Sequence, residues 1–322
     1  MAVYTEVPDD ALRDFVSAYD IGDVTSCKGI AEGVENSNYL LRTTEDDYIL
    51  TLYEKRVRRE DLPFFLGLMD HLSGKNFPAP VPIHGKDGVA LRELCGKPAA
   101  ICSFLDGMWP RTITADHCRQ LGEAAARLHL AAADMRLTRL NALGPAGWAE
   151  LAAATESRAD EVQTGLAGLI REELAFLNAA WPDNLPTGVI HADMFPDNVF
   201  FNDDRLSGVI DFYFACNDAL AYEIAVCLNA WCFDESAAYR KECGKALIDG
   251  YNSIRPLSTV ETDALPILCR GAALRFLLTR LYDVLNHPPG AFVKPKDPMD
   301  YVARLSFHQG VISPDQYSRS AV

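Results

Sequence analysis

The chain has 322 residues, of which 49% are hydrophobic and 23% charged, proportions typical of a folded globular protein. Its formal net charge of −15 argues against a nucleic-acid partner, because phosphate backbones are bound by clustered Lys and Arg. The nine cysteines include no CxxC pair, which favours reduced thiols. No uncharged apolar run is long enough to span a membrane, and the acidic N-terminal stretch lacks a signal-peptide core. We therefore expect a cytoplasmic protein that does not bind nucleic acid or membranes.

The first third of the chain alternates strand patterns with helices. A short amphipathic helix is predicted over residues 8–19, followed by a β-rich segment over 24–53. Apolar residues at helical spacing predict a helix over 59–73. Two further strands are expected around the GKDG sequence at 85–88, leading into PAAICSFLDG at 98–107.

The rest of the chain is mainly helical. Helices are predicted from Thr114 onward, including a long stretch over 160–181, and they return after a short β interlude at 188–214. This change of pattern predicts an α+β, bilobal architecture. A small β-rich lobe would comprise residues 1–105, and a larger helical lobe would comprise residues 106–322.

One segment, VIHADMFPDNVFFNDDRLSGVIDF at 189–212, concentrates the polar residues that carry chemistry. His191, Asp193 and Asn198 form the pattern HxDxxxxN, and Asp211 follows thirteen residues later. Gly-Val-Ile precedes both His191 and Asp211, which predicts that both follow short strands. A surface loop with Asp and Asn capping turns would share part of this pattern, but not the matching apolar lead-ins.

These residue types suit phosphoryl transfer, which depends on positioning and on neutralising the charge of the phosphates. Magnesium prefers hard oxygen ligands, so Asp211 and Asn198 are the predicted metal ligands. Asp193 is the predicted base for the hydroxyl of the acceptor. His191 is expected to hold the shape of the loop.

The same residues resemble the protein-kinase-like superfamily, in its aminoglycoside phosphotransferase and choline kinase branch. There the metal-binding Asp stands in an Ile-Asp-aromatic triplet, as Ile210-Asp211-Phe212 does here. The resemblance implies a bilobal kinase fold and the use of ATP with Mg²⁺.

Four segments extend the resemblance to the bacterial homoserine kinases of this branch: GVENSNYLLRTTEDDYILTLYE, LPFFLGLMDHL, ALRFLLTRLYD and KPKDPMDYV. It implies phosphorylation of L-homoserine, a small-molecule substrate, in threonine biosynthesis. Another small-molecule kinase, acting on choline, ethanolamine or an aminoglycoside, is an alternative. A nucleotide-binding pseudokinase is a further one.

The pseudokinase alternative rests on two departures from the superfamily pattern. Kinases of this superfamily place a Lys on the third strand and pair it with a helical Glu. In this chain the corresponding positions are Thr51 and Phe65. Lys55 and Arg56 are the nearest candidates for the missing cation.

The expected nucleotide contacts lie in two places. Gly29 and Gly33 precede Asn36, Ser37 and Asn38, which are predicted to cradle phosphates; an ordinary polar turn is the alternative.

Ser103 and Leu105 are expected to form the hinge whose backbone groups pair with adenine, and the alternative there is a plain linker. Asp218 and Glu223 are expected to brace the catalytic loop.

The acceptor site is the least defined. Arg275 and Arg280 are candidates for binding the carboxylate of homoserine, because a guanidinium suits bidentate recognition. Trp231 and Tyr282 suggest an aromatic cage for choline instead, although aromatic residues at helical spacing commonly form the core.

Overall fold

The computed structural model describes residues 5–30, 36–54, 57–287 and 294–318. The chain divides into two compact units. The first consists of Met1–Gly107 with Met135–Arg139 and Ser207–Tyr213, and the second consists of Met108–Asp134, Leu140–Leu206 and Phe214–Val322. None of the helices in these described ranges is long and apolar enough to cross a bilayer.

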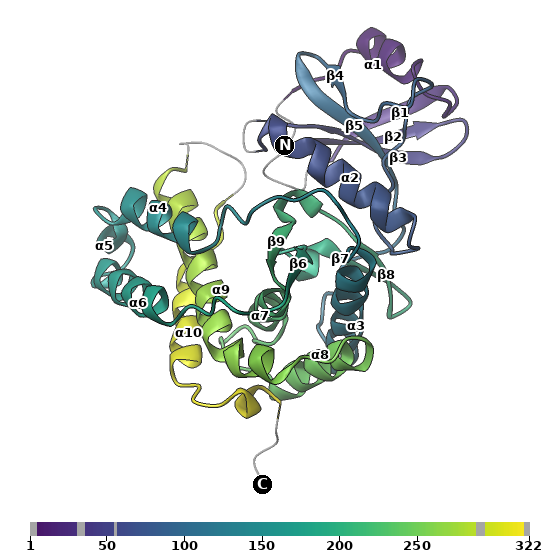
Figure 1. Ribbon diagram of the computed structural model, residues 1–322. Helices are drawn as coiled ribbons and strands as arrows, with labels where there is room; N and C mark the ends of the chain where they lie inside the picture. The colour runs from purple at the N-terminus through teal and green to yellow at the C-terminus, as the bar shows by residue number, and fades with distance from the viewer. Residues whose placement is uncertain (1–4, 31–35, 55–56, 288–293, 319–322) are drawn as a thin grey trace. The chain divides into compact units, whose positions relative to one another are not determined.

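The first unit is built on a five-stranded antiparallel sheet in the order β1-β2-β3-β5-β4 (Figure 1). Its strands are β1 (Val24–Gly29), β2 (Ser37–Thr43), β3 (Asp47–Leu52), β4 (Arg92–Leu94) and β5 (Lys97–Ser103). Helix α1 (Asp9–Val16) buries Leu12 and Phe15 in one cluster with Leu41, Leu50 and Ile101 of the sheet. The short helix η1 (Arg59–Asp61) leads into α2 (Leu62–Ser73).

Most of the elements predicted for this unit are present, but the turn between its last two strands lies further along the chain than expected. The turn that joins β4 to β5 is at Cys95 and Gly96, which have φ values of 52° and 72°. The GKDG sequence instead forms a turn before β4, in which the Gly88 amide donates to the Gly85 carbonyl over 2.8 Å. The expected strand leading into PAAICSFLDG corresponds to β5, whereas the stretch before GKDG forms an isolated bridge from Pro82 to Cys102. The turn was misplaced because Gly85, Gly88 and Gly96 are all turn-forming residues.

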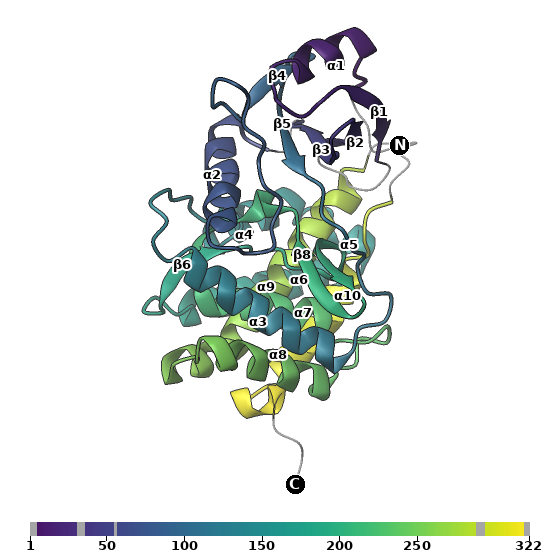
Figure 2. The same ribbon diagram turned by 90° about the vertical axis from the view of Figure 1, so that its right-hand side faces the viewer.

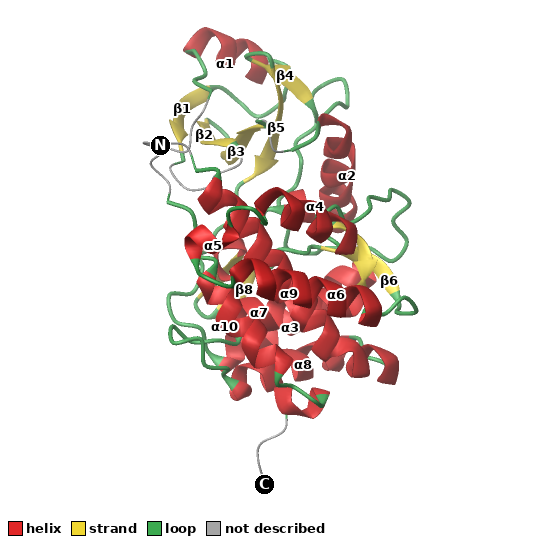
Figure 3. Ribbon diagram, turned by 90° about the vertical axis from the view of Figure 1, so that its left-hand side faces the viewer, coloured by secondary structure: helices red, strands yellow, loops and turns green. Residues whose placement is uncertain are grey.

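Helices dominate the second unit, as Figure 3 shows in red. They are α3 (Ala115–Ala131), α4 (Pro145–Thr155), α5 (Ala159–Val162), α6 (Leu166–Ala180), α7 (Leu220–Trp231), α8 (Lys241–Ile254), α9 (Thr259–Leu285), α10 (Met299–Gln309) and η4 (Pro314–Tyr317). Every residue of α7 is buried, so this helix forms the centre of the unit.

Two glycines bring α3 and α8 unusually close together, and these helices lie side by side in Figures 1 and 2. A Cβ on Gly122 would lie 2.1 Å from the carbonyl oxygen of Leu247, and one on Gly250 would lie 2.1 Å from that of Arg119. Any larger residue at either position would force the two backbones apart.

The single long helix predicted over 160–181 is interrupted. Gly165 adopts a left-handed conformation with φ of 86°, between the end of α5 and the start of α6. A left-handed residue cannot continue a right-handed helix, so the apolar periodicity on both sides belongs to two separate helices.

Short strands frame the polar segment at 189–212. Strand β6 (Thr187–Ile190) pairs antiparallel with β9 (Cys216–Ala219), with Ile190 opposite Cys216. Strands β7 (Val199–Asn202) and β8 (Arg205–Val209) form a hairpin, as predicted. Its two turn residues, Asp203 and Asp204, both have positive φ, as a two-residue hairpin turn requires. The short helices η2 (Pro196–Asn198) and η3 (Phe212–Phe214) complete the region.

Candidate active site

The loop from His191 to Asn198 begins where β6 ends and closes on itself through two polar side chains. The Asn198 Nδ2 donates to the Asp193 backbone oxygen over 2.9 Å and to its carboxylate Oδ2 over 3.1 Å. The Asp193 amide donates to His191 Nδ1 over 3.2 Å, so the buried imidazole fixes the backbone at the carboxylate. The three residues of the HxDxxxxN pattern therefore lie together, and the amide oxygen of Asn198 is not used in either bond to Asp193.

The loop contains a strained residue, Ala192, which has a left-handed φ of 63°. Its amide donates to both carboxylate oxygens of Glu223 over 3.2 and 3.1 Å, and the His191 amide donates to the same carboxylate. On the other side, Arg275 Nη1 donates to the Ala192 carbonyl. These bonds from α7 and α9 offset a conformation that costs an L-residue about 1–2 kcal/mol.

Glu223 is fully buried behind the loop. Burial raises the pKa of its carboxyl to about 7, while the hydrogen bonds from the Ala192 and His191 amides and the nearby Arg275 act to lower it. The carboxylate accepts hydrogen bonds from two backbone amides of the loop, those of His191 and Ala192.

The two arginines expected at the acceptor carboxylate have other partners. Arg275 is 1% exposed, and its guanidinium lies over the rings of Phe276 and Phe214, at 4.5 and 5.6 Å. It supports the loop from behind, through the Ala192 carbonyl. This supporting role differs from the expected contact with substrate, because a buried guanidinium held by a backbone carbonyl is not presented to a soluble acceptor.

Arg280 likewise binds protein groups. Its Nη1 donates to the Asp297 carbonyl and to Asp300 Oδ2, each over 2.8 Å, and its guanidinium lies 4.6 Å from the ring centre of Tyr301. It therefore holds the segment that leads into α10, which again differs from the expected contact with the acceptor. The proposed choline cage is not favoured either, since Trp231 is buried and donates to the Met194 carbonyl.

Asp211 lies two residues beyond β8 and also has a left-handed φ, of 64°. It belongs to the first compact unit, whereas Asp193 and Asn198 belong to the second. Within the described ranges, no cluster of three or more His, Cys, Asp or Glu side chains is arranged to hold a metal. The pairing of Asp211 with Asn198 as metal ligands stays a prediction.

Thr51 and Phe65, the positions expected to replace the Lys–Glu pair, have polar and aromatic neighbours, and the Arg139 guanidinium, paired with Asp61, lies 5.0 Å from the centre of the Phe65 ring. Thr51 on β3 is buried and donates to Asn38 Oδ1 over 2.9 Å. Phe65 on α2 packs edge-on against Tyr213 at 5.7 Å, and the Tyr213 hydroxyl lies 3.2 Å from that of Tyr53. Burial raises the pKa of Tyr213, so its hydroxyl stays protonated. Replacement of both members of an ion pair leaves no buried charge without a partner.

The side chains of the predicted phosphate cradle form hydrogen bonds with other residues of the first unit. Asn36 Oδ1 accepts from the Glu54 amide over 3.3 Å, Ser37 Oγ donates to Glu54 Oε1 over 2.8 Å, and Asn38 accepts from Thr51. Their side chains thus stabilise the β2–β3 pair in this structure. Gly33, Lys55 and Arg56 lie outside the described residues.

The predicted hinge follows β5. The Ser103 amide donates to the Val81 carbonyl over 2.9 Å, and the Phe104 amide donates to Asp47 over 3.3 Å. Neither bond uses the Ser103 carbonyl or the Leu105 amide. These are an acceptor and a donor of the kind that an adenine edge requires.

Two residues that the sequence did not single out lie at the catalytic loop. Lys296 Nζ is 3.1 Å from Asp197 Oδ2, and it lies 5.6 Å from the centre of the Phe195 ring. The signal was present, since Asp197 is inside the HxDxxxxN pattern and Lys296 is inside KPKDPMDYV. Their proximity was not predictable, because they are 99 positions apart.

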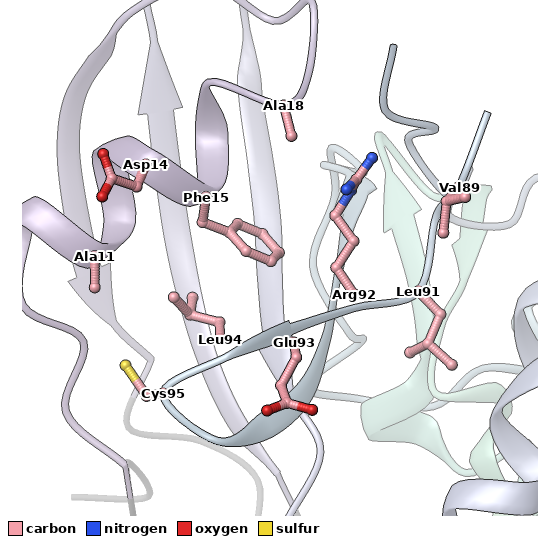
Figure 4. A pocket seen from close by; sticks show the side chains of 10 residues that line it. All are labelled: Ala11, Asp14, Phe15, Ala18, Val89, Leu91, Arg92, Glu93, Leu94 and Cys95. Atoms are coloured by element: carbon pink, nitrogen blue, oxygen red, sulfur yellow. The ribbon is translucent and has the colours of Figure 1, made fainter. Parts of the chain in front are cut away.

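A pocket of about 520 Å³ in the first unit is separate from these residues (Figure 4). It is lined by α1 and by the stretch around β4: Ala11, Asp14, Phe15, Ala18, Val89, Leu91, Arg92, Glu93, Leu94 and Cys95. None of the predicted catalytic or nucleotide-binding residues lines it, so it adds nothing to the candidate site.

The sequence matches the Phosphotransferase enzyme family over residues 26–257, and the chain belongs to that family. It is therefore a phosphotransferase. Within this family the chain is similar to two curated relatives that are both called homoserine kinase. That of Paramagnetospirillum magneticum is 61% identical over 98% of this chain and 99% of its own length. That of Granulibacter bethesdensis is 62% identical over 96% of this chain and 97% of its own length.

The fold is shared with solved structures of small-molecule kinases. The solved structure of a choline kinase from Cryptosporidium parvum superimposes with a TM-score of 0.68, covering 94% of each chain. The two sequences are only 14% identical, so this likeness concerns the fold alone. The predicted α+β, kinase-like architecture is confirmed.

Proposed function

We infer that the protein is a homoserine kinase, which transfers the γ-phosphoryl group of ATP to the hydroxyl of L-homoserine and forms O-phospho-L-homoserine. The observation that carries this inference is the similarity along nearly the whole chain to curated homoserine kinases that are 57–62% identical to it. The product places the enzyme in threonine biosynthesis. A cytoplasmic location suits these substrates.

We assign the role of general base to Asp193. Its carboxylate is fixed by Asn198 and by a loop that Glu223 and Arg275 hold in place. A carboxylate so restrained accepts the proton of a bound hydroxyl as that oxygen attacks the γ-phosphorus. The supports matter because transfer depends on alignment of the attacking oxygen.

For magnesium, the donor set fits the metal. Asp211 offers a carboxylate and Asn198 an amide oxygen, both hard ligands of the kind Mg²⁺ prefers. When bound, the ion supplies positive charge against the triphosphate.

For the nucleotide, the Ser103 carbonyl and the Leu105 amide are the proposed adenine contacts. We propose no binding of nucleic acid, because the chain has a formal net charge of −15.

The inference is tested by ADP release with a panel of acceptors: L-homoserine, choline, ethanolamine and kanamycin. We expect turnover with L-homoserine and little with the others. Turnover with choline or ethanolamine, and none with L-homoserine, would replace the assigned acceptor while leaving the phosphotransferase in place. Absence of turnover with every acceptor would contradict the inferred activity.

A further inference from the structure

An exposed ion pair adjoins the proposed base. Asp197 is part of the catalytic loop, one residue before the Asn198 that holds the Asp193 carboxylate. Lys296 reaches it from the segment that precedes α10, with 3.1 Å between Nζ and Oδ2. Both groups belong to the second compact unit, as do Asp193 and Asn198.

The segment that carries Lys296 is anchored to this loop by aromatic packing. Phe195 of the loop contacts Phe276 of α9 at 4.7 Å, and Phe276 contacts Tyr301 of α10 at 5.3 Å. Arg280 fixes the chain just after Lys296, through the Asp297 carbonyl. Lys296 is therefore held beside the loop whether or not its ammonium is paired with Asp197.

The pair itself is solvated, with 62% of the Lys296 side chain and 55% of the Asp197 side chain exposed. An ion pair this exposed contributes little to stability, so it opens at little cost. The cations behind the loop contrast with it. Arg275 is buried, and Arg280 is 13% exposed and bonded to Asp300. Of these three cations, Lys296 is the one presented to solvent at the loop.

We propose that Lys296 and Asp197 together bind the head group of an α-amino acid acceptor. Lys296 takes the α-carboxylate and Asp197 takes the α-ammonium, so that one protein ion pair is exchanged for two with the substrate. The proposal rests on the inferred function and names the residues that select the acceptor. A free amino acid has both charges on one carbon, which matches an acid and a base within ion-pair distance of each other.

In homoserine the hydroxyl and the charged head group lie close together. Two methylene groups separate its hydroxyl from the α-carbon, a span of about 4 Å in an extended chain. Asn198 follows Asp197 in the chain and donates a hydrogen bond to the Asp193 carboxylate. In the proposal, one short loop therefore contacts the hydroxyl through Asp193 and the head group through Asp197. Choline lacks the carboxylate that Lys296 requires.

The test compares Lys296→Met and Asp197→Asn with the wild-type enzyme. For Lys296→Met we expect the KM for L-homoserine to rise about tenfold or more, with kcat and the KM for ATP changed less than about twofold. Lys296→Arg should restore most of the affinity. Lys245→Met is the matched control, because Lys245 forms an exposed ion pair with Asp249 in α8.

Analogues that lack one charge separate recognition from loop support. Two analogues of L-homoserine serve as competitive inhibitors. The first, 3-aminopropan-1-ol, lacks the carboxylate, and the second, 4-hydroxybutanoate, lacks the ammonium. Lys296→Met should raise the inhibition constant of 4-hydroxybutanoate only. Asp197→Asn should raise that of 3-aminopropan-1-ol only.

An unchanged KM for L-homoserine in Lys296→Met would overturn the proposal. So would a fall in kcat shared by both variants with KM unchanged, since this is the effect of a merely structural pair. A wild-type enzyme inactive on L-homoserine would contradict the inferred function instead, which keeps the two failures distinguishable.

Discussion

In the loop from His191 to Asn198, neighbouring residues hold the carboxylate of Asp193, the proposed base. Asn198 donates a hydrogen bond to the Asp193 carboxylate, and His191, which is buried, accepts one from the Asp193 amide. Replacement of Asp193 by Asn keeps the shape of the side chain but removes its ability to take a proton. We expect kcat to fall by about 10²–10⁴.

The affinity for ATP should barely change in Asp193→Asn, because the proposed partner of this carboxylate is the acceptor. Nucleotide binding measured by calorimetry beside steady-state kinetics checks both statements. Wild-type kcat in this variant would remove Asp193 from the role of base.

Asp211 is best tested by a substitution that respects its backbone. At a φ of 64° an Ala would add strain, whereas Asn tolerates the left-handed region. Asp211→Asn should therefore keep the fold, seen as an unchanged circular dichroism spectrum, and lower kcat by about 10² or more through loss of a metal-binding charge. Retention of more than a tenth of kcat would exclude Asp211 as the main carboxylate ligand.

At the scale of elements, α7 and α9 both hold the loop, through bonds of Glu223 and Arg275 to the Ala192 backbone. Arg275→Met removes the donor to the Ala192 carbonyl. We expect the free energy of unfolding to fall by about 1.5–3 kcal/mol, the value of a hydrogen bond to a charged group, and kcat to fall with it. Urea unfolding and steady-state kinetics provide the measurement.

The supporting role of Arg275 makes a further distinction. The KM for L-homoserine should change no more than the inhibition constant of 3-aminopropan-1-ol, which lacks a carboxylate. Arg119→Met in α3, where the arginine pairs with Asp116 at the surface, is the control. A selective rise in the KM for L-homoserine, with unchanged stability, would return Arg275 to the acceptor site.

Across the whole molecule, buried histidines make stability depend on pH. His308 lies in the core, bonded to Tyr317 at 2.9 Å and to Asn229 at 3.2 Å, and burial lowers its pKa from 6.5 to about 3. Between these values the unfolded chain binds a proton that the folded chain does not. The stability contributed by the neutral ring is thus lost as the pH falls below 6.5.

His308→Gln removes this titration. The difference in unfolding free energy between wild type and variant should shrink by about 1.4 kcal/mol from about pH 7.5 to about pH 5.5. Glu223, whose raised pKa acts in the opposite direction, is common to both proteins and cancels. Urea unfolding at the two pH values is the measurement, and the control is His71→Gln, at a partly exposed histidine in the last turn of α2. A constant difference would show that His308 is not held neutral.

The sequence by itself determined the features that depend on near neighbours. Strand alternation, helical periodicity and capping patterns are local, so α1, α2 and the β7–β8 hairpin were predictable. The catalytic pattern was predictable for the same reason, since His191, Asp193 and Asn198 are held together by bonds that span two to five residues.

Only the tertiary structure decided which distant side chains meet that loop. Arg275 reaches Ala192 across 83 positions, and Lys296 reaches Asp197 across 99. Periodicity indicates that a helix has a buried face, but it does not say which of two arginines five residues apart is buried by packing. Arg275 is therefore a support, and the exposed cation at the loop is Lys296, because burial and long-range contact are set by how α7, α9 and α10 pack together.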